Sequence, residues 1–493
     1  MNQIDQLGKI KALLDSGAID QNEFQKLKNE VLNQSIERGI PNSINEPRKA
    51  SPSSNKKKKV IGYVSTISVI SLIVILFIFF TSKKVVFVPY LKTNGKFVYV
   101  DSSSMKQKID NEYDECRLFS EELAAVKVDG KWGFIDKVGK QVIGTKYEEC
   151  ADFNEGYASF KYQDKWGFID INGQEMIPAI YYNVESFSNG LARVSLMNPN
   201  SNPRILNGFI DKSGKEIIPM QNIGTYTEIH DGLLGVGFAD ENMEGYHAGY
   251  FNMKGERVTS FEYNNISAFS EGLALVAKGT QYTYKSFEGK WGFIDASGEI
   301  KIPLIYDDAQ SFQEGLAAIN SNGKWGFIDK KGYEVIPTQY EFVSSFSEGL
   351  AAVIKPNEKA GREMGFIDKT GMVVINFKYE GLEHNFKDGV ACVNLGNNKK
   401  GYIDKEGNEL TSQKYDHGEE FIDGFAMVGV GQEIYGSDGY VGFEGKWGVI
   451  NKKGEEIVPL IYDEMNNVNG TLYVTLNGSK FYIDKNNREY REK

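Results

Sequence analysis

The chain has 493 residues, 41% of them hydrophobic and 25% charged, with 27 Tyr, 30 Phe and 52 Gly. This composition is typical of strands joined by tight turns, and it argues against disorder over most of the chain. Residues 82–493 contain 45 basic and 60 acidic residues, a net charge of −15, whereas residues 1–81 have a net charge of +4. Binding nucleic acid needs a cationic surface, so the charge argues against such a partner for the long acidic part.

Residues 1–35 are predicted to form two short helices around a tight turn. Apolar residues recur at helical spacing, and Asp20 with Glu23 is a variant of the capping box that begins a helix. The segment resembles the SHOCT family of short helical hairpins at Leu7, Leu13, Leu14, Gly17, Ile19, Asp20, Glu23, Phe24, Lys28 and Leu32. Family members usually carry this module at the C-terminus, whereas here it comes first. A segment of about thirty residues buries little core, so we expect it to self-associate or to pack on another protein. A merely amphipathic segment next to the membrane is the alternative.

Residues 36–59 read as a flexible basic linker, and residues 60–81 as a transmembrane helix. The run from Val60 to Phe80 has no charge and, at ~1.5 Å per residue, reaches about 30 Å. Four lysines at 56–59 precede it, which predicts a cytoplasmic N-terminus and an extracytoplasmic repeat region. The alternatives are a signal peptide and a buried core helix. About sixty residues precede the run and no small-residue cleavage site follows it, which favours a span.

A short apolar run ending in Asp or Asn, most often Phe-Ile-Asp, recurs along residues 82–493. The Asp or Asn falls at positions 101, 136, 170, 211, 252, 295, 329, 368, 404, 451 and 484, at intervals of 33 to 47 residues. All five Trp residues stand just before this run, in the phrase Lys-Trp-Gly. Such a period predicts a solenoid, a propeller or an array of about eleven units.

One unit, residues 315–349, shows the expected elements. A strand over 316–319 is followed by Asn322-Gly323, the signal for a two-residue hairpin turn, and by a partner strand over 324–328. The phrase from Asp329 to Gly332 is a second turn, and a third strand begins at 335. Each unit is therefore predicted to be a small antiparallel sheet.

The repeat resembles the WG (or KWG) repeat family over residues 97–484. The residues that form the signature are Trp132, Gly133, Asp136, Trp166, Gly167, Asp170, Trp291, Gly292, Asp295, Trp325, Gly326, Asp329, Trp447 and Gly448. The resemblance implies a β-repeat module of secreted or membrane-linked proteins with no assigned chemistry.

The recurring positions suggest structural roles. The Gly after Trp indicates a bulge or a close approach, and we expect a large ring of a neighbouring unit to lie over it. The Ala of Leu-Ala indicates a tight contact between units. The Asp is expected to close its turn rather than bind calcium, because each turn has one carboxylate and a Lys follows most of them. Propellers usually close at four to eight blades, so we predict an open β-hairpin solenoid, with one or two β-propellers as the alternative.

No catalytic, cofactor or metal site is predicted. Cys116 and Cys150 occupy the same repeat position, which favours a core role, with a disulfide between adjacent units as the alternative. His230, His247, His384 and His417 share no metal-ligand spacing, and no Cys-x-x-Cys or nucleophile motif occurs.

The sequence thus predicts a membrane-anchored extracytoplasmic module. We expect it to bind an extended ligand, a cell-envelope glycan or a peptide or protein, without catalysis. One alternative is a transmembrane sensor or assembly scaffold that signals through the cytoplasmic helical hairpin. The other is a hydrolase with a site between units.

Overall fold

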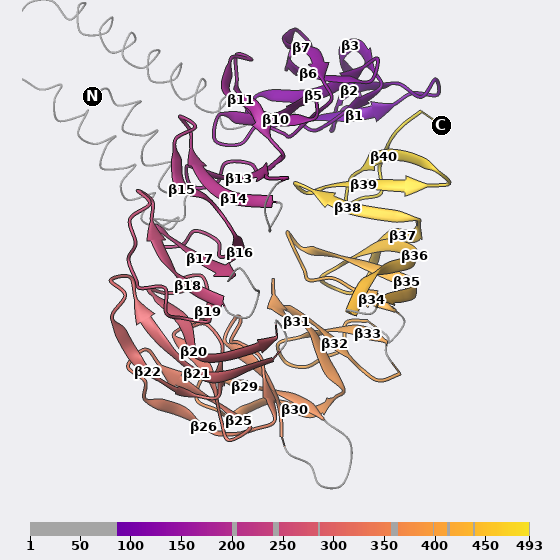
Figure 1. Cartoon of the computed structure of the whole chain (residues 1–493). Helices are drawn as coiled ribbons and strands as arrows, with labels where there is room; N and C mark the ends of the chain where they lie inside the picture. The colour runs from indigo at the N-terminus through magenta and orange to yellow at the C-terminus, as the bar shows by residue number, and fades with distance from the viewer. Residues whose placement is uncertain are drawn as a thin grey trace, which may run out of the picture. The chain divides into compact units, whose positions relative to one another are not determined.

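A computed structural model describes residues 86–199, 205–239, 246–283, 286–355, 363–397, 399–411, 415–436 and 439–492. The predicted helical hairpin (1–35), linker (36–59) and transmembrane helix (60–81) lie outside these ranges. Residues 85–493 form one compact unit built from β-strands (Figure 1). Within the described ranges, no helix has the length and apolar character needed to cross a bilayer.

The strands form eleven antiparallel sheets that follow one another along the chain. The first five sheets comprise β1 (Phe87–Leu91), β2 (Phe97–Asp101) and β3 (Gln107–Tyr113); β4 (Glu115–Cys116), β5 (Leu123–Val128), β6 (Lys131–Asp136) and β7 (Gln141–Tyr147); β8 (Glu149–Cys150), β9 (Tyr157–Tyr162), β10 (Lys165–Asp170) and β11 (Glu175–Tyr181); β12 (Asn183–Val184), β13 (Leu191–Met197), β14 (Ile205–Asp211) and β15 (Glu216–Gln221); β16 (Ile223–Tyr226), β17 (Leu233–Ala239) and β18 (Tyr246–Asn252).

The other six sheets continue the same pattern. They comprise β19 (Asn265–Ile266), β20 (Leu273–Thr283), β21 (Ser286–Asp295) and β22 (Ile300–Tyr306); β23 (Asp308–Ala309), β24 (Leu316–Ser321), β25 (Lys324–Asp329) and β26 (Glu334–Tyr340); β27 (Phe342–Val343), β28 (Leu350–Ile354), β29 (Met364–Asp368) and β30 (Val373–Tyr379); β31 (Gly381–Lys387), β32 (Val390–Asn394) and β33 (Lys400–Asp404); β34 (His417–Gly418), β35 (Phe425–Gly436), β36 (Gly439–Asn451) and β37 (Glu456–Tyr462); β38 (Glu464–Val468), β39 (Thr471–Leu476), β40 (Ser479–Ile483) and β41 (Glu489–Tyr490).

Sheet β23–β26 illustrates how one unit folds. Its strands pair in chain order, and Asn322-Gly323 joins β24 to β25 with φ angles of 55° and 75°. Both angles are positive, as the predicted two-residue hairpin turn requires. The turn from Asp329 to Gly332 joins β25 to β26, and the single residue Glu341 leads on to the next sheet.

Neighbouring sheets share their cores. In one buried cluster, Ala351 and Val353 of β28 pack with Leu316 of β24 and Phe327 of β25 in the preceding sheet. The Ala of Leu-Ala is 0% or 1% exposed in each of the units in which it recurs, namely Ala124, Ala192, Ala274, Ala317, Ala351, Ala391 and Ala426. A larger side chain at this position would push two sheets apart, so the predicted tight contact between units is confirmed.

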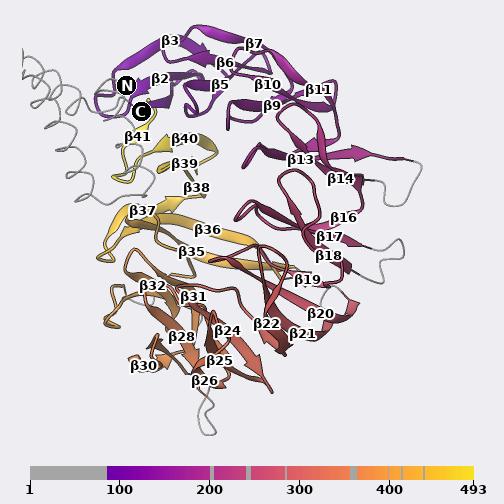
Figure 2. The same ribbon diagram turned by 90° about the vertical axis from the view of Figure 1, so that its left-hand side faces the viewer.

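The eleven sheets close into one ring, and the predicted open solenoid is wrong. Figure 2 shows the first sheet (indigo) beside the last (yellow). Leu91 of β1 forms a parallel bridge with Arg491, and Val88 and Val100 share a buried cluster with Tyr482 and Tyr490. Closure depends on the angle between successive sheets, and no single position of the repeat encodes that angle.

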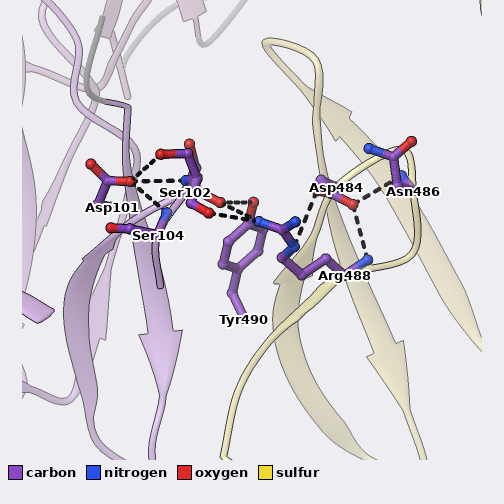
Figure 3. Close-up of polar contacts among 8 residues, drawn as sticks. Asp101, Ser102, Ser104, Asp484, Asn486, Arg488 and Tyr490 are labelled. Carbon is purple, nitrogen blue, oxygen red and sulfur yellow. Dashed lines mark hydrogen bonds and ion pairs between the residues drawn. The ribbon is translucent and has the colours of Figure 1, made fainter. Parts of the chain in front are cut away.

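Polar contacts complete the seam between the last and first sheets (Figure 3). Arg488 Nη1 donates to the carbonyl oxygens of Ser102 at 2.9 Å and Ser103 at 3.2 Å. Across the same seam, the backbone N–H and the hydroxyl of Thr93 both donate to Glu492 Oε2 at 2.9 Å. The seam therefore joins segments about 400 residues apart. The entropic cost of closing such a loop rises only slowly with the length of the loop.

Candidate functional site

The Gly after each Trp makes room for the backbone of its own sheet. In sheet β23–β26, a Cβ on Gly326 would lie 2.5 Å from Ile336 O and 2.7 Å from Thr338 N. There β26 bulges, because Trp325 pairs with Tyr340 while Phe327 pairs with Ile336. The same backbone contact occurs at Gly133, Gly167, Gly292, Gly365 and Gly448. The predicted bulge is present, but the expected ring of a neighbouring unit is not what lies over these glycines.

The recurring Asp closes its own turn. Asp329 Oδ1 accepts the backbone N–H groups of Lys331 and Tyr333, each at 2.9 Å. Gly332 has φ 83°, and a Cβ there would lie 3.6 Å from Ile302 of the preceding sheet. The turn glycines of other units lie on the equivalent Ile in the same way, as Gly371 does on Ile336. The turn therefore shapes its own sheet and also packs against the sheet before it.

In several units an acidic residue before the Leu-Ala strand binds the next unit. Glu314 Oε2 accepts the N–H of Gly349 at 3.0 Å and pairs with Lys369 Nζ at 2.9 Å. We call this arrangement the turn-side clasp. It recurs between Glu155 and Gly190 with Lys212, Glu271 and Gly315 with Lys330, Glu348 and Gly389 with Lys405, and Asp388 and Gly424 with Lys452. The Lys that follows the turn Asp thus has a structural partner in the preceding unit.

A second clasp lies at the other end of several sheets. The Lys of Lys-Trp-Gly pairs with the acidic residue that follows Tyr, as Lys446 does with Asp463. The same carboxylate accepts the N–H of the next hairpin turn, at 2.9 Å from Asn477 N to Asp463 Oδ2. This hairpin-side clasp recurs at Lys96 and Asp114, Lys290 and Asp307, and Lys399 and Asp416.

The five Trp residues pack between successive sheets rather than forming an open stacking surface. Trp132 is 6% exposed, and its ring lies under the guanidinium of Arg117, 4.6 Å from the ring centroid. Trp166, Trp291, Trp325 and Trp447 are partly buried against core clusters. The recurring residues therefore build the ring, and groups available to a ligand have to come from positions where units differ.

The clearest departure is an extended hairpin that covers a histidine. Strands β35 and β36 run for 12 and 13 residues, whereas β24 and β25 run for six each. The extension brings Phe443 within 5.4 Å of the His417 ring and 5.0 Å of the Trp447 ring, measured between centroids. Glu433 Oε1 lies 3.4 Å from His417 Nδ1. We call His417, Glu433, Phe443 and Trp447 the His417 cluster.

Small residues allow this arrangement. A Cβ on Gly429 would lie 2.6 Å from Phe443 Cε1, so only glycine lets the Phe443 ring lie flat on β35. His417 is the first residue of the short strand β34, and it pairs there with Gly429. The cluster thus depends on one glycine and on the length of one hairpin.

Charges surround the His417 cluster. Burial lowers the pKa of His417, and the Glu433 carboxylate opposes that shift, as does Glu383 of β31. Glu383 forms an ion pair with Lys400, whose side chain is 9% exposed. Lys400 occupies the position that Trp holds in other units. A neutral imidazole, a carboxylate and two aromatic rings are groups that hold polar ligands with apolar faces, such as sugars.

The thiol next to this cluster is not activated. Cys392 Sγ lies close to Gly418, but Cys392 is 1% exposed and burial raises the pKa of its thiol to about 12. Catalytic thiols have lowered pKa values instead. Cys116 and Cys150 are free and buried as well, so the alternative of a disulfide between them is wrong. Over the described residues, no group of three or more His, Cys, Asp or Glu side chains could hold a metal ion.

Sequence reasoning did not single out this cluster. The four histidines were considered only as metal ligands or members of a nucleophile motif, and the five Trp residues mainly as members of the repeat signature. A usable signal was present, because Phe-Glu-Gly-Lys-Trp-Gly occurs at 287–292 and 443–448 and in no other unit. Both copies lie in the sheets with the longest hairpins, β20–β21 and β35–β36.

The architecture defines a class, the all-β repeat proteins whose units close into a propeller-like ring. The family model described as the WG-containing repeat matches residues 99–132, 132–166, 166–198, 208–221, 249–282, 291–325, 325–359, 364–399, 401–432 and 447–479. The chain therefore belongs to the WG repeat family. No curated protein matches the chain.

Several solved structures are weakly similar. The tricorn protease is 13% identical with a TM-score of 0.24, covering 79% of this chain and 46% of its own, so the present chain spans less than half of that protein. Apo AztD from Citrobacter koseri is 11% identical with a TM-score of 0.23, covering 59% of this chain and 93% of its own. PorZ, a surface component of the type-IX secretion system of Porphyromonas gingivalis, is 8% identical with a TM-score of 0.24, covering 83% and 64%. No functional argument rests on these similarities.

Proposed function

We propose that this protein is a non-catalytic binding module, anchored in a membrane by residues 60–81, whose ring is extracytoplasmic. Its ligand is an extended molecule, a cell-envelope glycan or a peptide. The His417 cluster is the principal contact site on the ring. Residues 1–35 remain in the cytoplasm in this arrangement.

One observation carries the binding role. The recurring polar side chains of the ring are engaged in turns and clasps, whereas the His417 cluster gathers an imidazole, a carboxylate and two rings at a position where units differ. Partial exposure of Phe443 and Trp447 leaves ring surface for a ligand. Burial of Cys392 supports binding rather than covalent catalysis.

The test measures the affinity of the full-length protein in detergent for panels of cell-wall glycan fragments and peptides. Phe443→Ala removes a ring that contacts His417, and Glu433→Gln removes the charge beside it. We expect either change to weaken binding about tenfold, the effect of losing one well-placed contact of about 1.4 kcal/mol.

Asn322→Ser is the matched control, because it lies at the tip of the short β24–β25 hairpin, which lacks the extension. Its affinity should equal that of the unaltered chain. Circular dichroism should show the same strand content for all three variants. Binding to no member of either panel, or equal affinity for the Phe443 and control variants, would contradict the proposal.

A further inference from the structure

One side of the ring carries all the Asp/Asn-x-x-Gly turns, and we call it the turn face. The turn-side clasps keep these turns next to one another from unit to unit, as Glu314 does with Lys369. The first described strand begins on the same face. Phe87 pairs with Asp101, the recurring Asp of the first sheet, which closes a turn of the same kind with Ser104 in place of the Gly.

Large apolar side chains project from the tips of this face. Val138 is 80% exposed, Tyr333 68%, Met372 65% and Ile171 47%. The first three are the most exposed large hydrophobic residues of the described ring. All four lie within or directly after an Asp-x-x-Gly turn.

Comparison of the units shows that Tyr333 and Met372 are not required by the fold. The position directly after the turn Gly is polar in the other units, where it holds Lys140, Gln174, Lys215, Glu256, Glu299, Asn408 and Glu455. Only Tyr333 and Met372 are apolar there. A single exposed apolar residue is normal on a protein surface, whereas several on one face mark a candidate interaction surface.

The apolar tips lie on two separated arcs of the ring. Val138 and Ile171 belong to the second and third sheets, and Tyr333 and Met372 to the seventh and eighth. A partner that contacts both arcs at once has to be broad and nearly flat. Lysines stand beside the tips, for example Lys330 and Lys331 before Tyr333 and Lys369 before Met372, and both Lys330 and Lys369 also serve in clasps.

The short segment before β1 favours the lipid bilayer as the partner. The uncharged run ends at Phe80, so residues 81–86 are all that separates it from β1. Six residues reach about 20 Å when fully extended. If the uncharged run is the anchor of the proposed function, a tether this short favours the turn face, rather than the hairpin side, as the face toward the lipid.

We propose that the turn face docks on the phospholipid bilayer, with Val138, Ile171, Tyr333 and Met372 inserted among the headgroups and the nearby lysines beside anionic lipid. The idea rests on the proposed function, because it takes residues 60–81 as the anchor. It goes further by orienting the ring, so that the hairpin side, with the His417 cluster, faces away from the membrane. Apolar tips flanked by lysine are the combination that favours interfacial binding.

Fluorescence quenching by lipid tests this orientation. Tyr333→Cys and Met372→Cys are made in the full chain, labelled with an environment-sensitive dye and reconstituted into vesicles of phosphatidylcholine and phosphatidylglycerol containing doxyl-labelled lipid. Ser479→Cys, on the exposed β39–β40 hairpin at the opposite side, is the matched control. The native thiols label poorly, since Cys116, Cys150 and Cys392 are 7%, 4% and 1% exposed.

We expect blue-shifted emission and several-fold stronger quenching at 333 and 372 than at 479. Equal quenching at the three positions overturns the docking proposal and leaves the anchor intact, provided that the chain resists extraction at alkaline pH. A chain that is extracted overturns the anchor and the docking together. Protection at 333 and 372 that follows protein density rather than lipid quencher assigns the face to a second copy of the chain, and also overturns the proposal.

Discussion

Single residues in this ring have roles that neighbouring strands impose on them. Gly326 is required because the bulged backbone at Ile336 and Thr338 lies where its side chain would be. Gly144, by contrast, has no heavy atom within 4 Å of its hypothetical Cβ and no positive φ. Packing therefore requires glycine at position 326 but not at position 144.

Gly326→Ala should destabilise the protein, because the new methyl group forces backbone apart rather than displacing a flexible side chain. We expect a loss of about 2–3 kcal/mol in unfolding free energy, within the usual range for overpacking. Urea unfolding followed by tryptophan fluorescence measures it. Gly144→Ala is the control and should lie within about 0.5 kcal/mol of the unaltered chain. Equal midpoints for the two variants would show that the bulge yields at little cost.

The His417 ring should make stability depend on pH. Burial lowers the pKa of His417 in the folded state below its unfolded value of about 6.5, so the unfolded chain binds more protons. The stability that depends on neutral His417 is therefore fully present at neutral pH, and it is lost as pH falls below about 6.5. The thermal midpoint should fall less between pH 7 and pH 5.5 in His417→Gln than in the unaltered chain. Parallel curves for the two proteins would rule out this residue as the source.

At the scale of elements, the unit is a sheet that holds its neighbour by a shared core and two clasps. The sequence predicted the hairpin turns and the Asp turns because Asn-Gly and Asp-x-x-Gly specify local backbone conformation. It also identified the Ala contact, since a small residue in an otherwise bulky strand reports close packing. It misjudged the Gly after Trp, because nothing local distinguishes a ring overhead from a bulged backbone. It could not identify the clasps, because their partners become neighbours only when sheets stack. These partners lie 35 residues apart or more on the turn side, as Glu314 and Gly349 do, and 14 to 18 apart on the hairpin side.

The clasp between Glu314 and Lys369 should show a measurable coupling. Their side chains are 30% and 43% exposed, so solvent screens the pair and a modest value is expected. A double-mutant cycle with Glu314→Ala and Lys369→Ala should give about 0.5–1 kcal/mol, reduced in 1 M salt. Lys331→Ala is the control. Lys331 follows Lys330, the turn Lys that pairs with Glu271, and a parallel cycle with Glu314 should give no coupling. A coupling of zero in the first cycle would mean that the clasp is only a geometric coincidence.

For the whole molecule, the determining feature is the seam. Repeat spacing predicted about eleven units but not their closure, since the rotation per unit is a property of packed sheets. The His417 cluster was also beyond sequence reasoning, because it depends on how an extended hairpin curves over a residue 26 positions before Phe443. The sequence predicts the structure that the units share, but not the places where one unit differs from the others.

Removing residues 488–493 should loosen the seam without unfolding distant sheets. The deletion removes β41 and the Arg488 contacts to Ser102 and Ser103. Amide hydrogen exchange of β1 and β2 should then speed up by at least tenfold, while β24 and β25 on the far side of the ring exchange at unchanged rates. Arg488→Ala alone should give a smaller change in the same strands. Uniform acceleration across all sheets would indicate that the ring unfolds as one cooperative body.

Each clasp takes one half from a unit and the other half from its successor, so the joints that carry a clasp are built from the same parts. An additional copy of the unit arrives with both halves, and it can be inserted between two existing copies without altering either. Among the described residues, Arg488 and Glu492 make the terminal joint with contacts of another kind. Tandem duplication can therefore add units to such a chain. The number of blades is then limited by the angle between successive sheets, because the first and last sheets have to meet.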